Sequence, residues 1–306
     1  MKKPVRRLVF VFALMGLMSC TEPIDLENKG MAPMLVITGV ISDRVKDHDF
    51  SFNDNQIVIQ KTTSFFARES PAFVTGAKVW VDGIPLIDMK NGAYEFPDEE
   101  FCGVPGQTYT LEVHYDMDGS GAVKVYTATT TMPQACQLDS ISLRSGIFRP
   151  SDEYRAWLWL HYQDDGSVPT YYCAKLRNDN NGYPYSGRIL RYSLFSLSDL
   201  VLDGASRTTP SGWNIRHEMQ YDNQRVYPMF AGDLLMVELE SLSKEYYDYL
   251  AAARTELTQN NPLFSGPRSN LPSNIKGGAL GIFGSYTTSR ASLILPAGLP
   301  ARPDRP

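Results

Sequence analysis

The stretch Thr108-Tyr-Thr-Leu-Glu-Val-His-Tyr115 alternates between apolar and polar side chains without a break. Successive side chains of a β-strand point to opposite faces of the sheet. We therefore expect Tyr109, Leu111, Val113 and Tyr115 to face a hydrophobic core, while the residues between them face water. The stretch is predicted to be a half-buried strand of an antiparallel sheet.

Short alternating runs of the same kind flank this stretch on both sides. They cover residues 35–41, 56–60, 77–82, 94–96 and 123–129. The turn pairs Asp82-Gly83, Asn91-Gly92 and Pro105-Gly106 lie between them. Six or seven short strands within about 100 residues are typical of an immunoglobulin-like β-sandwich. Residues 34–133 are therefore predicted to form such a sandwich.

A second β-rich series follows residue 133. Its clearest runs are 138–143, 155–163, 170–176, 187–194, 234–239 and 274–295. One amphipathic helix is expected near residues 243–257, because Ser243 can cap its start and apolar side chains recur on one face. We predict an all-β, mainly antiparallel protein with a second β-rich domain over residues 134–295. Residues 296–306 are proline-rich and are expected to be a disordered tail.

The N-terminus has the layout of a secretory signal. Four basic residues, Lys2, Lys3, Arg6 and Arg7, precede an apolar run over residues 8–18. This run is shorter than the roughly 20 residues that cross a bilayer as a helix. At its end, Leu17-Met-Ser-Cys20 resembles the bacterial lipobox. We predict a signal peptide over residues 1–19, acylation of Cys20, palmitate included, and a lipidated tether over residues 20–33.

The lipid on Cys20 would attach the protein to a membrane of the cell envelope. Thr21 follows the cysteine in place of the aspartate that retains lipoproteins at the inner membrane in other Gram-negative groups. The outer membrane is therefore expected, with the periplasmic and the surface face both open.

The charge balance argues against nucleic acid as a partner. Removal of the signal peptide lowers Lys+Arg from 29 to 25, against 34 Asp+Glu. Binding to a phosphate backbone depends on clustered basic residues, and the chain has no run of five of them.

Two segments resemble ligand-binding loops, and each has a simpler structural interpretation. The glycine-rich segment 277–284 precedes a predicted strand, so close packing of backbones is favoured over phosphate binding. The segment Asp116-Met-Asp-Gly-Ser-Gly121 resembles the start of a calcium loop, but Thr127 stands where that loop needs a glutamate. A hairpin turn is favoured there.

We find no pattern of catalytic or metal-ligating residues. The histidines, His48, His114, His161 and His217, lack the spacing of a zinc site. No nucleophile motif stands out. We expect no catalytic residues, no metal and no cofactor.

Three cysteines remain beside Cys20. In an oxidising compartment one bridge and one buried thiol are a natural arrangement. Cys173 lies in an apolar run and is predicted to be buried, so a bridge between Cys102 and Cys136 is our hypothesis. Three free thiols are the alternative.

The run over residues 155–162 is apolar on both faces. Trp157, Trp159 and His161 share one face, and Tyr171 and Tyr172 follow in the next run. Burial on both sides is the favoured interpretation. The alternative is an aromatic binding patch formed by these five residues.

Near the C-terminus, the segment Ser273-Asn-Ile-Lys-Gly-Gly-Ala-Leu-Gly-Ile-Phe-Gly284 resembles the end of domain of unknown function 4249, a family of Bacteroidetes lipoproteins. Other runs match its layout in order, among them the lipobox, Leu35-Val-Ile-Thr-Gly39 and Gly76-Ala-Lys-Val-Trp-Val81. The resemblance implies a cell-envelope location and genes often found beside TonB-dependent receptors. It supplies no catalytic residues. In such bacteria Asp139-Ser140-Ile141 resembles an O-glycosylation signal, which makes Ser140 a candidate site.

Three functions follow as expectations. The first is a non-enzymatic accessory or binding partner of a TonB-dependent transporter, whose small-molecule or peptide ligand the sequence does not identify. The second is a structural or assembly protein of the envelope. The third is a hydrolase whose site is assembled by the fold from residues that are distant in the chain.

Overall fold

The computed structural model describes residues 33–45, 54–63, 71–145, 155–164, 169–179, 189–197, 206–216, 231–258 and 271–296. The predicted signal peptide, Cys20, almost all of the tether and residues 297–306 lie outside the described residues. The described part is mainly antiparallel β-structure with one helix, which confirms the predicted all-β class. Within it, no helix is both long and apolar enough to cross a membrane.

The first half of the described chain contains nine strands. They are β1 (Leu35–Ser42), β2 (Gln56–Lys61), β3 (Ala72–Phe73), β4 (Lys78–Val81), β5 (Ile84–Pro85), β6 (Ile87–Asp88), β7 (Ala93–Glu95), β8 (Thr108–Tyr115) and β9 (Lys124–Thr131). The six runs predicted from sequence are all strands. The alternation in β8 is confirmed, because Leu111 and Val113 are fully buried and the polar residues between them are not.

The second half contains seven strands and the helix. They are β10 (Leu138–Ser145), β11 (Arg155–Gln163), β12 (Thr170–Asp179), β13 (Ile189–Leu197), β14 (Ser206–Arg216), β15 (Leu234–Leu242), α2 (Lys244–Thr258) and β16 (Leu280–Ile294). The predicted helix is confirmed within one residue at each end. Sequence reasoning missed β14, which has polar residues, a proline and a glycine in its middle.

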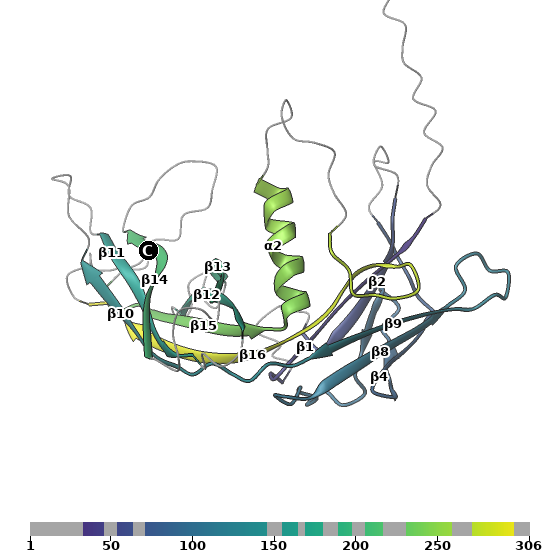
Figure 1. Ribbon diagram of the computed structural model, residues 1–306, viewed down its shortest axis with the longest axis horizontal. Helices are drawn as coiled ribbons and strands as arrows, with labels where there is room; N and C mark the ends of the chain where they lie inside the picture. Colours follow the sequence, from purple (N-terminus) through teal and green to yellow (C-terminus); the bar gives the residue numbers. More distant parts are fainter. Residues whose placement is uncertain are drawn as a thin grey trace, which may run out of the picture. The chain divides into compact units, whose positions relative to one another are not determined.

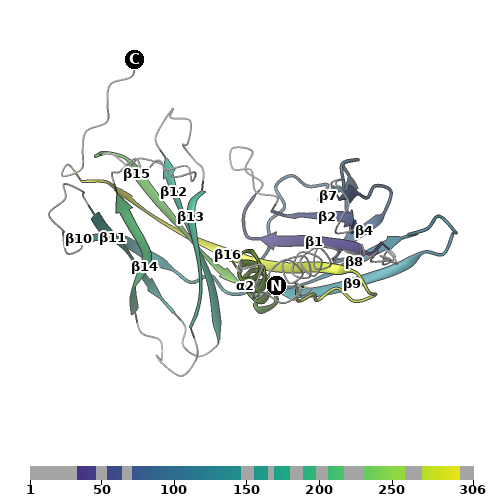
Figure 2. The same cartoon turned by 90° about the horizontal axis from the view of Figure 1, so that it is seen from above.

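One long strand joins the two halves. The first part of β16 pairs with β1 in parallel, from Val36 opposite Leu280 to Ser42 opposite Tyr286. Its second part pairs with β15 in antiparallel fashion, from Tyr286 opposite Leu242 to Ile294 opposite Leu234. The result is a nine-stranded sheet with strands from both halves, in which β1 and β16 run side by side (Figure 2).

Two smaller sheets cover this large sheet. The sheet β5-β4-β8-β9 packs on the β1 and β2 region, and the sheet β10-β11-β14 packs on the β12 and β15 region. Each pair of layers encloses its own core. Ile275, Ala279 and Phe283, which we assigned to the second domain, are buried in the core of the first. The boundary predicted at residues 133 and 134 therefore does not separate the sheets, because a strand from the C-terminal end completes the first sandwich.

Helix α2 lies on the opposite face of the large sheet, beside β15 and β16 (Figure 1). Gly284 lets it approach closely, since a Cβ at this position would lie 2.6 Å from the Cβ of Tyr246. The hydroxyl of Ser243, the predicted cap, accepts a hydrogen bond from the backbone N–H of Ser285 at 3.3 Å. The start of the helix is thus fastened to the sheet rather than standing free.

Within the glycine-rich segment 277–284, Gly281 makes the closest approach to the backbone of another strand. It has a φ of +107°, and a Cβ there would lie 2.0 Å from the carbonyl oxygen of Ile37 in β1. A backbone atom of a paired strand cannot move aside without breaking the pairing. The interpretation of this segment as a close-packing device is therefore supported.

Substitution of Gly281 by Ala should disrupt the pairing of β1 with β16. We expect the free energy of unfolding to fall by roughly 3 kcal/mol or more, since both a positive φ and a clash oppose the new side chain. Gly278 is the matched control, because its φ is +81° but the nearest atom to an added Cβ is 3.6 Å away. Gly278→Ala should cost about 1 to 2 kcal/mol. Equal urea midpoints for the two variants would contradict this account.

Candidate functional site

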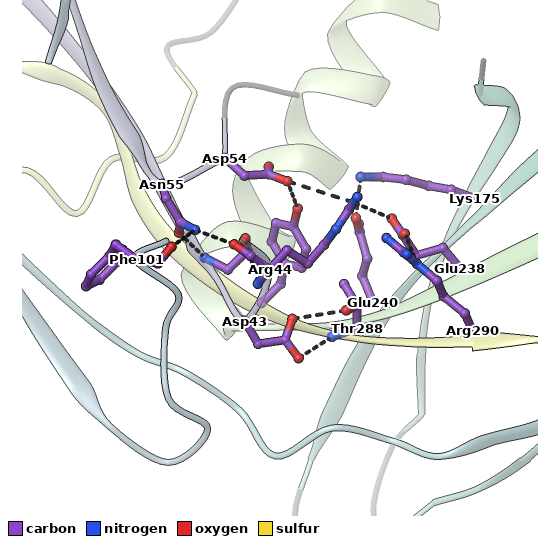
Figure 3. Close-up of polar contacts among 12 residues, drawn as sticks. Asp43, Arg44, Asp54, Asn55, Phe101, Lys175, Glu238, Glu240, Thr288 and Arg290 are labelled. Carbon is purple, nitrogen blue, oxygen red and sulfur yellow. Dashed lines mark hydrogen bonds and ion pairs between the residues drawn. The ribbon is translucent and has the colours of Figure 1, made fainter. Parts of the chain in front are cut away.

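A cluster of charged residues occupies the face of the large sheet that carries α2 (Figure 3). In β15, Val237 and Leu239 face the second core. Glu238 and Glu240, which alternate with them along the strand, therefore face the other way. The residues that end β1 and begin β2 meet these glutamates from the first half of the chain. The cluster therefore lies where the two halves share one sheet.

Glu238 is the centre of the cluster and has a fully buried side chain. One carboxylate oxygen accepts from Arg44 Nη1 at 3.2 Å, and the other accepts from Arg290 Nε at 2.8 Å. Arg290 is its cross-strand neighbour in β16, whereas Arg44 follows β1. One buried carboxylate thus binds cations from both ends of the chain.

Glu240 forms the second buried ion pair, with the ammonium group of Lys175 in β12. Lys175 Nζ also lies 5.5 Å from the centroid of the Tyr286 ring, which adds a cation–π contact. The Tyr286 hydroxyl in turn donates to Asp54 at 2.6 Å. Strands β12, β15 and β16 are therefore linked to the segment before β2.

The segment after β1 is fixed by two further residues. Asp43 accepts from the backbone N–H and the hydroxyl of Thr288, both at 3.0 Å. Asn55 accepts from the backbone N–H of Ser42 at 2.8 Å and donates to the carbonyl of Arg44 at 2.7 Å. A φ of 56° at Asn55 is the left-handed conformation that asparagine tolerates. These contacts hold the backbone that presents Arg44.

The cluster contains more carboxylates than cations, and this sets its titration. Asp54, Glu238 and Glu240 face Arg44, Lys175 and Arg290, and Asp43 is a fourth carboxylate that binds Thr288. Burial raises the pKa of Glu240 to about 7, an effect that its pairing with Lys175 only partly offsets. Burial also opposes the charges on Lys175 and Arg44, but attraction to Glu240 and Glu238 outweighs it and raises both pKa values. Lys175 and Arg44 therefore stay charged while Glu240, with its pKa of about 7, accepts a proton near neutral pH.

A carboxyl group with a pKa near 7 can serve as a general acid or base. Glu240 is 1% exposed, however, so a substrate would reach it only after its neighbours moved. The geometry suits a structural role, in which the ion pairs of Glu238 and Glu240 hold the two sandwiches in a fixed arrangement. We call this cluster the charged joint. The sequence signal for this site was two glutamates spaced by two in an otherwise apolar strand, which our sequence analysis did not single out.

The predicted aromatic patch is divided among three places. Trp159 and His161 are half-buried on the outer face of β11, and the side chain of Trp157 lies outside the described residues. Tyr172 is fully buried in the second core and donates to Asp164, and burial raises its pKa. Tyr171 lies on the opposite face of the sheet, 5.0 Å from the ring of Tyr247 in α2. Leu158 and Leu160 are fully buried, so the predicted burial holds for one face of β11, whereas Trp159 and His161 on the other face are only half-buried.

The three described cysteines are free, so the hypothesis of a Cys102–Cys136 bridge is corrected in favour of its alternative. Cys102 is exposed in the first half of the chain. Cys136 is buried, and its thiol donates to the carbonyl of Gln163 at 2.8 Å, away from Cys102. Burial raises the pKa of Cys136 to about 11. Cys173 is buried as predicted.

The remaining candidate segments are surface features. The segment 116–121 joins β8 to β9, and Asp116 accepts from the backbone of Gly119 and Gly121 at 2.9 and 2.7 Å. It is the predicted hairpin turn. Ser140 is exposed in β10. Among the described residues no group of three or more His, Cys, Asp or Glu is arranged to hold a metal ion.

In the part of the chain that the structure describes, two sandwiches share one sheet and are joined by buried ion pairs, which defines an all-β protein with one helix. A family model described as "Domain of unknown function (DUF4249)" matches residues 21–292, so the chain belongs to that family. This confirms the family resemblance inferred from the C-terminal segment. No curated protein matches the chain.

Removal of the central carboxylate should destabilise the protein strongly. We expect Glu238→Ala to lower the free energy of unfolding by roughly 3 to 5 kcal/mol, since it leaves the guanidinium of Arg44 buried without its main counter-charge. Asp248→Ala is the control, because its pair with Lys244 is exposed on α2 and should change stability little. Urea denaturation of both variants measures the difference. Similar losses in the free energy of unfolding would show that Glu238 does not hold the two sandwiches together.

The raised pKa of Glu240 predicts how stability depends on pH. The folded state favours the protonated carboxyl, so this stabilisation is complete below the ordinary pKa of 4.5 and is lost as the pH rises through about 7. Glu240→Gln mimics the neutral form. We expect its melting temperature relative to the wild type to increase between about pH 5 and about pH 8. A difference that does not change with pH would refute the assigned pKa.

Proposed function

We propose that this protein is an outer-membrane-anchored lipoprotein that serves as a non-enzymatic accessory or binding partner of a TonB-dependent transporter. The observation that carries the anchoring is Leu17-Met-Ser-Cys20, at the end of a short apolar run and ahead of a described fold that starts at Pro33. Lipid on Cys20 would hold the protein at the membrane through the segment between them.

Two features support a binding role over a chemical one. Among the described residues the most buried carboxylates, Glu238 and Glu240, are paired with arginine and lysine side chains within the protein. Such pairs fix geometry more than they add stability. The ion pairs also tie the two sandwiches into a scaffold on which surface residues keep their spacing, which is what a partner-binding accessory protein needs.

The test is affinity purification of the protein from its native outer membrane, followed by mass spectrometry of the proteins that accompany it. We expect a TonB-dependent receptor with the wild type. Cys20→Ser should remain unacylated, leave the membrane fraction and lose the receptor, while its urea midpoint stays that of the wild type.

Other results would separate the alternatives. A wild-type protein without lipid would refute the anchoring. An anchored protein that recovers only envelope assembly components would favour a structural role. Hydrolysis of an envelope substrate that Glu240→Gln abolishes would favour an enzyme.

A further inference from the structure

The two ends of the first sandwich differ in charge. All four described lysines between residues 33 and 133 lie toward one end: Lys61, Lys78, Lys90 and Lys124. The opposite end carries Asp82, Glu95, Asp98, Glu99 and Glu100. Strand register fixes these positions, because Leu35 lies opposite Lys61, Lys78 lies opposite His114, and Lys124 lies opposite Tyr115.

The basic end is where the chain enters the fold. Met34 accepts from the backbone of Thr62 at 2.9 Å, and Lys61 lies between Leu35 and Ala72. The hairpin after β8 reaches the same end, since Lys61 Nζ donates to the carbonyl of Met117 at 3.4 Å. We call this end, with its lysines and the β8–β9 hairpin, the tether end.

Apolar side chains are exposed at the tether end beside the lysines. Phe73 and Val123 are each 58% exposed and Met89 is 46% exposed. Phe73 lies in β3, two strands or about 10 Å from the start of β1. Lysines flanking exposed apolar groups match a membrane interface, where the ammonium groups meet phosphates and the apolar groups enter the acyl boundary.

Three carboxylates lie at the same end, and each has a partner within the protein. Asp88 pairs with Lys90 at 2.9 Å, and Asp116 accepts from backbone N–H groups in its own turn. Asp118 accepts from the backbone of Ser120 at 3.1 Å and is exposed. Acidic groups are therefore fewer here than at the opposite end.

We propose that the tether end is a membrane-contact surface that binds the anionic headgroups of the bilayer holding Cys20, which orients the protein with its acidic end away from that bilayer. The proposal rests on the lipid anchoring proposed above. The sequence has 12 residues between Cys20 and Pro33, and a random-coil chain of this length would span about 20 Å on average and about 45 Å when extended. This reach keeps the tether end close to the headgroups, within range of electrostatic attraction at low salt.

Val123 and Val104 provide a matched pair for the test, because they are 58% and 54% exposed at opposite ends of the same sandwich. The lipidated variants Val123→Trp and Val104→Trp are reconstituted into vesicles of phosphatidylglycerol and phosphatidylcholine brominated on its acyl chains. Tryptophan fluorescence is compared with the wild type in the same vesicles. We expect the fluorescence added at position 123 to be largely lost through quenching, and that added at position 104 to be retained.

A second pair of variants tests the charge. Lys90→Glu with Lys124→Glu in the Val123→Trp protein should restore the lost fluorescence, and high salt should do the same. Equal quenching at positions 123 and 104, or none at 123 while the protein stays on the vesicles, would overturn the membrane-contact surface and leave the anchoring intact. A wild-type protein that leaves the vesicles as readily as Cys20→Ser would overturn both.

Discussion

The pairing of β16 with both β1 and β15 is the constraint on which the rest of the structure depends. The first part of β16 runs parallel to β1, and its second part runs antiparallel to β15. A parallel pair between strands so far apart in sequence requires the intervening chain to fold back before the first sheet is complete. Gly281 permits this pairing because no side chain fits beside the carbonyl of Ile37.

The shared strand also creates the charged joint. Tyr286, Thr288 and Arg290 follow one another on one face of β16, and β15 places Glu238 and Glu240 beside them. The segments around Arg44 and Asp54 come from the first sandwich and meet this face at the junction. Buried ion pairs contribute little net stability, but an unpaired partner is costly, so the cluster tolerates few arrangements. The joint thus fixes how the two sandwiches meet.

The candidate site shows where sequence reasoning ends. Alternation correctly predicted that Leu158 and Leu160 are buried, since a pleated strand sends alternate residues to one face. Alternation also requires that the neighbours Tyr171 and Tyr172 lie on opposite faces of β12, so they could not share one patch, but it could not predict which of these faces would meet β11. The cysteine hypothesis failed for a related reason. The sequence shows how many thiols are present, but only the fold shows that the thiol of Cys136 donates to the carbonyl of Gln163.

By itself, the sequence determined the class of the protein, most of its strands, its helix and its family, because these follow from local alternation, turn residues and the glycine-rich C-terminal segment. The β14 strand escaped because its polar residues, its proline and its glycine do not give the alternation that marks a strand. Only the tertiary structure decided that a late strand completes the first sandwich and that Glu238 binds arginines from both ends of the chain. Arg44 and Glu238 are 194 positions apart and Arg290 and Glu238 are 52 apart, and no local periodicity encodes which distant strands will pair.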